Sequence, residues 1–185
     1  MDQVEVLLIA FGLAMDCLSV AITSGLTMRG SMLSSALRIG LSFGFFQAFM
    51  PVIGWLGGTS VISFVSGVDH WVAFGLLCLV GFKMVLGSLR KVPSEGKDNP
   101  LSIFSLLMLS VATSIDALAV GVSFAFLETP IVAPVVMIGS VTFLISSIGV
   151  YLGKRFGHFF GNKVEAVGGF ILIAIGAKIL IEHTV

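Results

Sequence analysis

Two aspartates stand inside apolar segments of this chain, in stretches that resemble each other. Asp16 lies in AMDCLSVA, residues 14–21, and Asp116 lies in SIDALAVG, residues 114–121. An ionised carboxylate that faces lipid costs at least about 2.5 kcal/mol, so both side chains are expected to face the protein interior and to be paired. Two negative charges that meet there require a cation or a proton between them. The pattern therefore predicts a divalent cation site.

Further oxygen donors surround the two aspartates in the sequence. Carboxylate, amide and hydroxyl oxygens suit Mn²⁺, Mg²⁺ or Ca²⁺ better than a soft cation such as Cu⁺. The candidate additional ligands are near an aspartate or in the middle of an apolar segment; they are Met15, Ser19, Gln47, Thr113 and Thr142. Two alternatives stay open, because such hydroxyls often bond to the preceding helical turn and buried aspartates can form a structural ion pair.

Three basic residues are possible counter-charges for the aspartates. Lys83 and Lys178 stand inside apolar segments, and Arg38 stands at the start of one. Each lysine can pair with an aspartate when the cation is absent, or its amine can reach the membrane interface along its flexible stem. Arg38 is expected to anchor the topology.

The composition requires that lipid surrounds these residues. The 185 residues are 57% hydrophobic and 11% charged, with a mean hydropathy of +1.11. A soluble domain of this size would expose large apolar patches, and apolar runs of about 20 residues favour helices over a β-barrel. The net charge is zero and no basic helix or tail is present, so we expect no nucleic-acid partner. Cys17 and Cys78 both lie in apolar runs and are interpreted as small hydrophobic residues.

Six membrane spans are predicted in an all-α protein. A polar cytoplasmic loop at 90–101 separates residues 1–89 from residues 102–185, with three spans on each side. The predicted spans lie near 4–25, 36–58, 69–89, 102–126, 131–153 and 165–183.

The basic residues predict how the spans are oriented. The first, third and fifth connections, or positions beside them, carry Arg29, Arg38, Arg90, Lys91, Lys97, Lys154, Arg155 and Lys163. The second and fourth connections and both tails have no lysine or arginine. Because cytoplasmic loops are enriched in these residues, the odd connections are expected in the cytoplasm and both termini on the opposite side.

The two halves of the chain resemble each other. Besides the aspartate segments, GFKMVL at 81–86 matches GAKILI at 176–181, and Gly44 and Gly54 align with Gly139 and Gly149. Halves with an odd number of spans insert in opposite directions, so the sequence predicts two inverted three-helix repeats. Such symmetry lets a central site open to either side of the membrane, which is typical of transporters, although channels and membrane enzymes also contain it.

The same residues carry a family resemblance. The segments AFGLAMD at 10–16, ATSIDALAVG at 112–121, PVIGW at 51–55 and IAIGAK at 173–178 resemble the MntP family of bacterial manganese efflux pumps. The resemblance covers the whole chain. It implies export of Mn²⁺ from the cytoplasm across the bacterial inner membrane, with Asp16 and Asp116 required and no permanently bound cofactor.

The residues by themselves leave other functions open. They predict a transporter of a divalent or other small cation, and an exporter of another metal or of an amino acid fits as well. A less favoured alternative is an intramembrane enzyme that uses paired aspartates, for which no accompanying catalytic motif is found. No GxxxxGK[ST] motif for ATP is present, and the sequence specifies no oligomeric state.

Overall fold

The part of the chain that the structure describes is entirely helical. The computed structural model describes residues 2–27, 31–65, 69–89 and 103–184, and these residues contain no strand. The helices are α1 (Gln3–Thr27), α2 (Met32–Val65), α3 (Asp69–Leu89), α4 (Ile103–Phe126) and α5 (Val132–Thr184). The prediction of an all-α protein is confirmed for these residues, whereas the predicted loop at 90–101 lies outside them.

Four stretches of the described helices are long and apolar enough to cross a membrane. They are Gln3–Gly25, Met32–Ser60, Ile103–Phe126 and Val132–Arg155. Two shorter apolar stretches, Trp71–Lys83 and Gly169–Ile181, fall in the third and sixth predicted spans. By length and composition the chain is therefore a multi-pass helical membrane protein.

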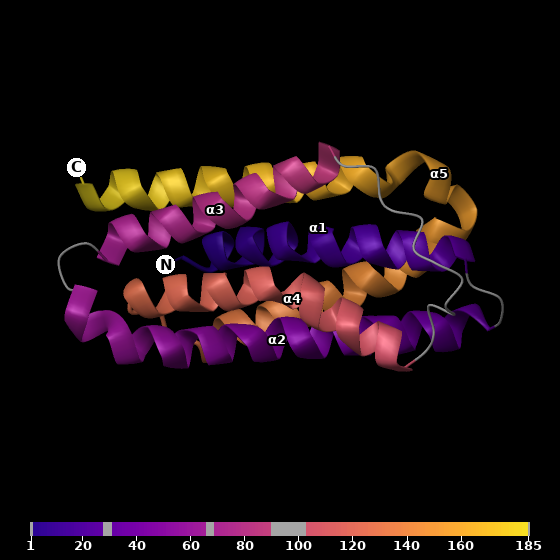
Figure 1. Cartoon of the computed structure of the whole chain (residues 1–185), viewed down its shortest axis with the longest axis horizontal. Coiled ribbons are helices and arrows are strands. Elements are labelled where there is room, and N and C mark those ends of the chain that lie inside the picture. Colours follow the sequence, from indigo (N-terminus) through magenta and orange to yellow (C-terminus); the bar gives the residue numbers. More distant parts are fainter. Residues whose placement is uncertain (1, 28–30, 66–68, 90–102, 185) are drawn as a thin grey trace.

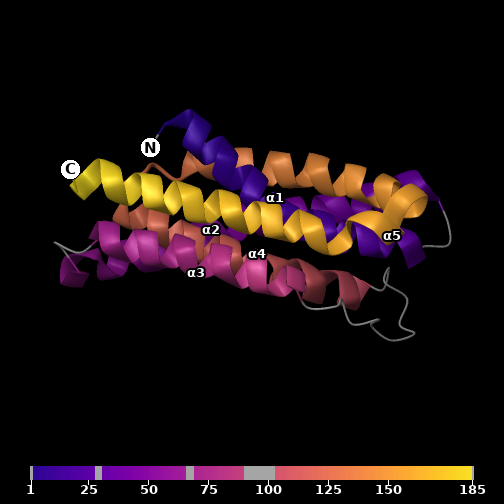
Figure 2. The ribbon, with the colours of Figure 1, turned by 90° about the horizontal axis from the view of Figure 1, so that it is seen from above.

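Helix α5 differs from the sequence-based expectation. A connection was expected between the spans near 131–153 and 165–183, yet the backbone stays helical from Val132 to Thr184. Figures 1 and 2 show that α5 turns back at one end of the bundle. Its two parts therefore run in opposite directions, and each lies beside other helices of the bundle. The segment 154–164 contains no proline, so backbone hydrogen bonds can continue through the bend.

The interior of the bundle is apolar and α1 is its most enclosed long helix. More than half of the α1 membrane window is buried, at 56%, against 28–39% for the other three long stretches. Ile9 and Leu13 of α1 pack with Leu77 of α3, Phe124 of α4 and Ile138 of α5. The outer faces carry large exposed hydrophobic side chains, as expected for a surface in contact with lipid.

Glycines bring α2 close to α4. A Cβ atom added at Gly54 would lie 2.0 Å from the carbonyl oxygen of Leu118, and one at Gly58 would lie 3.2 Å from that of Val122. Only a residue without a side chain permits this approach, which is how membrane helices gain packing energy.

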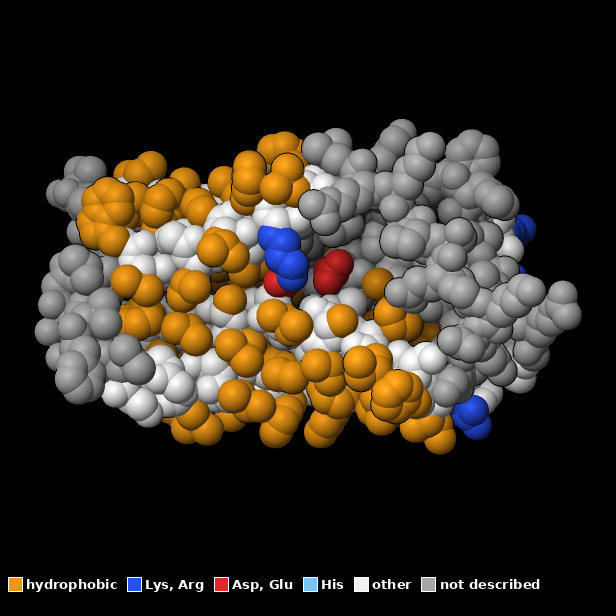
Figure 3. All heavy atoms as spheres, in the orientation of Figure 1, with side chains coloured by type: hydrophobic (Ala, Val, Ile, Leu, Met, Phe, Trp, Pro, Cys, Tyr) orange, Lys and Arg blue, Asp and Glu red, His pale blue; other side chains and the backbone are white. Residues whose placement is uncertain are grey.

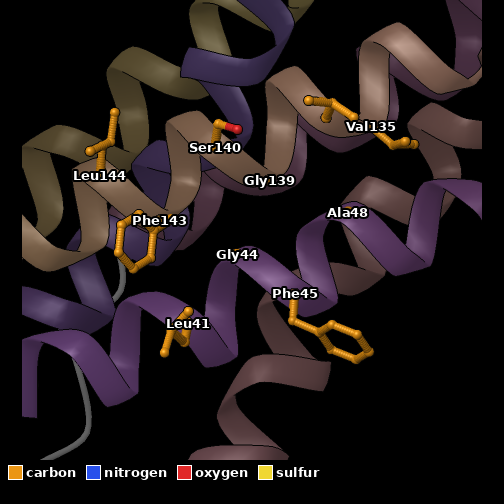
Figure 4. A pocket seen from close by; sticks show the side chains of 10 residues that line it. Leu41, Gly44, Phe45, Ala48, Val135, Gly139, Ser140, Phe143 and Leu144 are labelled. Carbon is orange, nitrogen blue, oxygen red and sulfur yellow. The ribbon is translucent and has the colours of Figure 1, made fainter.

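Glycines also bring α5 close to α1 and to α2. A Cβ atom at Gly149 would lie 2.7 Å from the Leu18 side chain, and one at Gly153 would lie 2.1 Å from the carbonyl oxygen of Ile22. Helices α2 and α5 cross where Gly44 faces Gly139, a pair shown in Figure 4. The contacts of α2 with α4, of α5 with α1 and of α5 with α2 therefore all depend on small residues.

The α2–α4 contact can be tested with two glycines of the same helix. We expect Gly54→Ala to lower the free energy of unfolding by about 1–3 kcal/mol, because the new methyl group would meet the backbone of α4. Gly57→Ala is the matched control, since a Cβ atom there meets nothing within 4 Å. Thermal unfolding in detergent measures both, and equal melting temperatures would contradict the proposed close approach.

Candidate metal site between α1 and α4

The two aspartates lie on helices that face each other across the core. Asp116 is 4% exposed and belongs to the buried stripe of α4, whereas Asp16 on α1 is partly buried. The stripe recurs every three or four residues, which places Thr113, Asp116, Ala117 and Val120 on one side of the helix. The amphipathic pattern of α4 thus turns a carboxylate toward the interior.

Cys17 follows Asp16 directly in α1 and has partners on two other helices. Its thiol is fully buried, accepts a hydrogen bond of 3.3 Å from Gln47 Nε2 on α2, and also bonds to the Thr113 side chain on α4. The sequence analysis interpreted Cys17 only as a small hydrophobic residue; its position next to Asp16 was the available signal.

Lys83 on α3 pairs with one of the aspartates. Its Nζ donates to Asp116 Oδ1 at 2.5 Å, and its side chain is 56% exposed while that of Asp116 is 6% exposed. Figure 3 shows a basic side chain beside acidic ones midway along a face that is otherwise mostly hydrophobic. The positive charge therefore stands at the surface and reaches inward to a buried carboxylate.

The other two predicted counter-charges lie elsewhere. Lys178 donates to Glu5 Oε1 at 2.5 Å, and Glu5 is near the start of α1, about three helical turns before Asp16. Arg38 is exposed on α2. Glu5 had not been singled out as a partner for an intramembrane lysine, because no sequence repeat or motif marks it.

Two predicted ligands are buried with an oxygen atom that lacks a hydrogen-bond partner. These atoms are Gln47 Oε1 and Thr142 Oγ1, and both side chains are 0% exposed. Ser146, one turn after Thr142 on α5, has the same property and was not predicted as a ligand. Gln47 is held by its amide nitrogen, which also donates to the carbonyl oxygen of Leu13 at 3.3 Å.

The remaining predicted ligands have ordinary local surroundings. The hydroxyl of Thr113 donates to the carbonyl of Leu109 at 3.0 Å, which leaves its own oxygen able to accept. Met15 packs against the hydrophobic core, and Ser19 offers its backbone carbonyl to the hydroxyl of Thr23 at 3.0 Å. Thr113 is thus the predicted hydroxyl ligand that lies closest to the Cys17 junction.

An apolar groove at the α2–α5 crossing is separate from these charged residues. Figure 4 shows its lining around Gly44 and Gly139, with Leu41 and Phe45 on α2 and Leu144 on α5. None of its lining residues is titratable, and Gln47 and Thr142 are not among them. The groove is therefore a lipid-facing surface rather than a metal site.

The described residues offer few charged donors for a metal ion. Within the described ranges no group of three or more histidine, cysteine or acidic side chains could hold a metal. Two carboxylates with neutral oxygen donors can bind a hard divalent cation, and fewer charged ligands give weaker binding. Weak binding allows release, which a transport site requires.

Comparison with known proteins identifies a single family. The family described as "Mntp: Putative manganese efflux pump" matches residues 30–180. Proteins named "Putative manganese efflux pump MntP" are similar over nearly their full length: one from Methanosarcina barkeri is 54% identical (95% of this chain, 94% of that protein), and one from Methanothermobacter thermautotrophicus is 49% identical (99% and 98%). One from Crocosphaera subtropica is 44% identical, covering 100% of this chain and 98% of that protein. No solved structure matches the chain.

The ion pair between α3 and α4 can be measured with a double-mutant cycle. Lys83→Met leaves a buried carboxylate without its ammonium partner, so we expect this variant to unfold at a lower temperature than the wild type. Adding Asp116→Asn removes the unpaired charge and is expected to restore stability, with a coupling of about 1–3 kcal/mol. Additive effects of the two substitutions in thermal unfolding would show that the pair contributes nothing.

Proposed function

Because this chain belongs to the MntP family, we propose that it exports Mn²⁺ from the cytoplasm through a mid-membrane site formed by Asp16 and Asp116. The observation that carries the proposal is the buried carboxylate of Asp116, which binds the ammonium group of Lys83 inside a bundle of apolar helices. Two negative charges at that depth call for a cation, and the names of the relatives indicate which one.

The ligands proposed for Mn²⁺ are the two carboxylates and the Thr113 hydroxyl. Hard oxygen ligands suit this ion, and Thr113 lies on the same buried side of α4 as Asp116. Lys83 occupies Asp116 when the metal is absent, so an arriving Mn²⁺ displaces the ammonium group. This exchange limits the change in buried charge on binding, because one positive group leaves the carboxylate as the metal arrives.

Equivalent helix contacts support the proposed inverted repeat. Gly54 and Gly58 of α2 lie against Leu118 and Val122 of α4, while Gly149 and Gly153 of α5 lie against Leu18 and Ile22 of α1. These are the residues that the sequence repeat relates to one another. The Gly44–Gly139 crossing pairs a glycine with its own repeat counterpart, as expected on the symmetry axis.

The arrangement of the helices supports six spans. The two parts of α5 run in opposite directions, and both chain termini lie at the same end of the bundle (Figure 1). A chain that crosses the membrane an even number of times has both termini on the same side. With the distribution of basic residues, we propose that both termini face away from the cytoplasm, in the inner membrane of the cell.

A second substrate class has a specific observation in its favour. Asp116 binds an ammonium group in this structure, that of Lys83. A site of this kind can hold the amino group of a small amino acid, so export of an amino acid is the alternative to export of a metal.

Transport in inside-out vesicles that contain the purified protein tests the proposal. Driven by a Mn²⁺ gradient alone, uptake of Mn²⁺ is expected to exceed that of Mg²⁺, Ca²⁺ and a panel of amino acids. Asp16→Asn and Asp116→Asn are each expected to reduce uptake at least about tenfold, because each removes half of the charge that holds the ion. Glu128→Gln is the matched control, since Glu128 is an exposed carboxylate outside the helices. Undiminished uptake by both aspartate variants would contradict the site, and selective amino-acid uptake would favour the alternative substrate.

A further inference from the structure

Three fully buried side chains carry oxygen atoms without a partner in the same region of the bundle. The atoms are Gln47 Oε1, Thr142 Oγ1 and Ser146 Oγ, and all three side chains are 0% exposed. Buried polar atoms in proteins are almost always satisfied, and an exception requires an explanation such as a bound ion or water. The three atoms belong to α2 and α5, two helices that pack against each other at Gly44 and Gly139.

The two hydroxyls depart from the behaviour of similar residues in this chain. The hydroxyls of Thr23, Ser35, Ser110, Thr113 and Ser123 each donate to the carbonyl four residues earlier, at 2.8–3.1 Å. That bond is the usual solution for a serine or threonine in an apolar helix. Thr142 and Ser146 are also helical and buried but leave their hydroxyl oxygens unpaired.

Helix packing brings the three residues to one level. Thr142 and Ser146 are four residues apart, so they share one face of α5. Gly149, one turn farther along α5, lies against Leu18 of α1. This register sets Thr142 and Ser146 beside the part of α1 that holds Leu13 and Cys17, the two residues to which the Gln47 amide donates.

A backbone oxygen adds to the same region. Pro51 lies inside α2 and is buried, and it has no N–H to donate to the carbonyl four residues earlier, which is that of Gln47. Gln47 thus offers a freed main-chain oxygen and an unpaired side-chain oxygen. Broken helices with exposed carbonyls form the coupling-ion sites of many secondary transporters.

We propose that Gln47, Thr142 and Ser146 bind a sodium ion at a site separate from the aspartate pair. The donors are neutral oxygens, so they suit a monovalent cation, whereas a divalent ion requires the carboxylates. The close approach of α2 and α5 at Gly44 and Gly139 leaves little room and favours Na⁺ over the larger K⁺. The nearby charges of Asp16 and Asp116 add electrostatic attraction for any cation.

The site is linked to the aspartates through one side chain. The Gln47 amide nitrogen donates to the thiol of Cys17, which follows Asp16 directly in α1. Binding of Na⁺ to Gln47 Oε1 fixes the orientation of that amide and so affects the aspartate site. A sodium gradient can then drive the export of Mn²⁺. This coupling rests on the proposed function, whereas the binding of Na⁺ does not.

Thermal unfolding of the purified full-length protein in detergent, with a metal chelator and no Mn²⁺, tests the binding. Replacing choline by Na⁺ at constant ionic strength is expected to raise the melting temperature by about 4 °C at 100 mM, with a smaller effect of K⁺. The double variant Thr142→Val and Ser146→Ala is expected to lose this response. It should melt no lower than the wild type in choline, because it removes two unpaired buried hydroxyls.

The control is Ser123→Ala, which removes a buried hydroxyl that is bonded to its own helix and should keep the sodium response. Equal shifts with Na⁺, K⁺ and choline would overturn the sodium site, as would a double variant that responds like the wild type. The sodium site would also be overturned if the double variant is no longer stabilised by Mn²⁺ against thermal unfolding but still responds to Na⁺. That result would assign these oxygens to the manganese site. Mn²⁺ flux in vesicles with and without a sodium gradient then tests the coupling alone, since an unchanged flux would overturn only that step.

Discussion

The cost of placing a carboxylate inside a membrane is the constraint from which the rest of this structure follows. Asp116 is almost completely buried, so it must always have a positive partner, and Lys83 provides one. A charge that needs a partner at all times is also a charge that can exchange one partner for another. The same electrostatic requirement therefore holds α3 against α4.

Close helix approach is the second requirement, because no hydrophobic force drives helices together in lipid. The bundle meets it with glycines at the crossing points, where α2 meets α4 at Gly54 and α2 meets α5 at Gly44 and Gly139. Backbones that nearly touch leave no room for bulk water around the polar residues of the core.

The sequence predicted the helical class, the positions of the apolar stretches and membership of the family, because hydropathy and motifs are local properties. It did not predict the continuous helix through the bend of α5, since charged residues and glycines there suggested a break. It also missed Ser146 and the role of Cys17, because an unpaired hydroxyl and a junction of three helices depend on packing. The partner of Lys178 was likewise unexpected. The repeat relates Lys178 to Lys83, and both lysines were expected to pair with an aspartate, whereas Lys178 binds Glu5.

The two lysines show how a symmetric sequence can produce an asymmetric state. Lys83 binds the central Asp116, whereas its repeat counterpart Lys178 binds Glu5, about three turns away from Asp16 along α1. If the proposed inverted halves had identical conformations, a central site would be equally accessible from both sides of the membrane and would leak. A transporter therefore needs halves that differ at any moment, and ion pairs are suitable points of difference because each can exist in more than one discrete arrangement. The unequal positions of these two ion pairs are one such difference between the two halves of the chain.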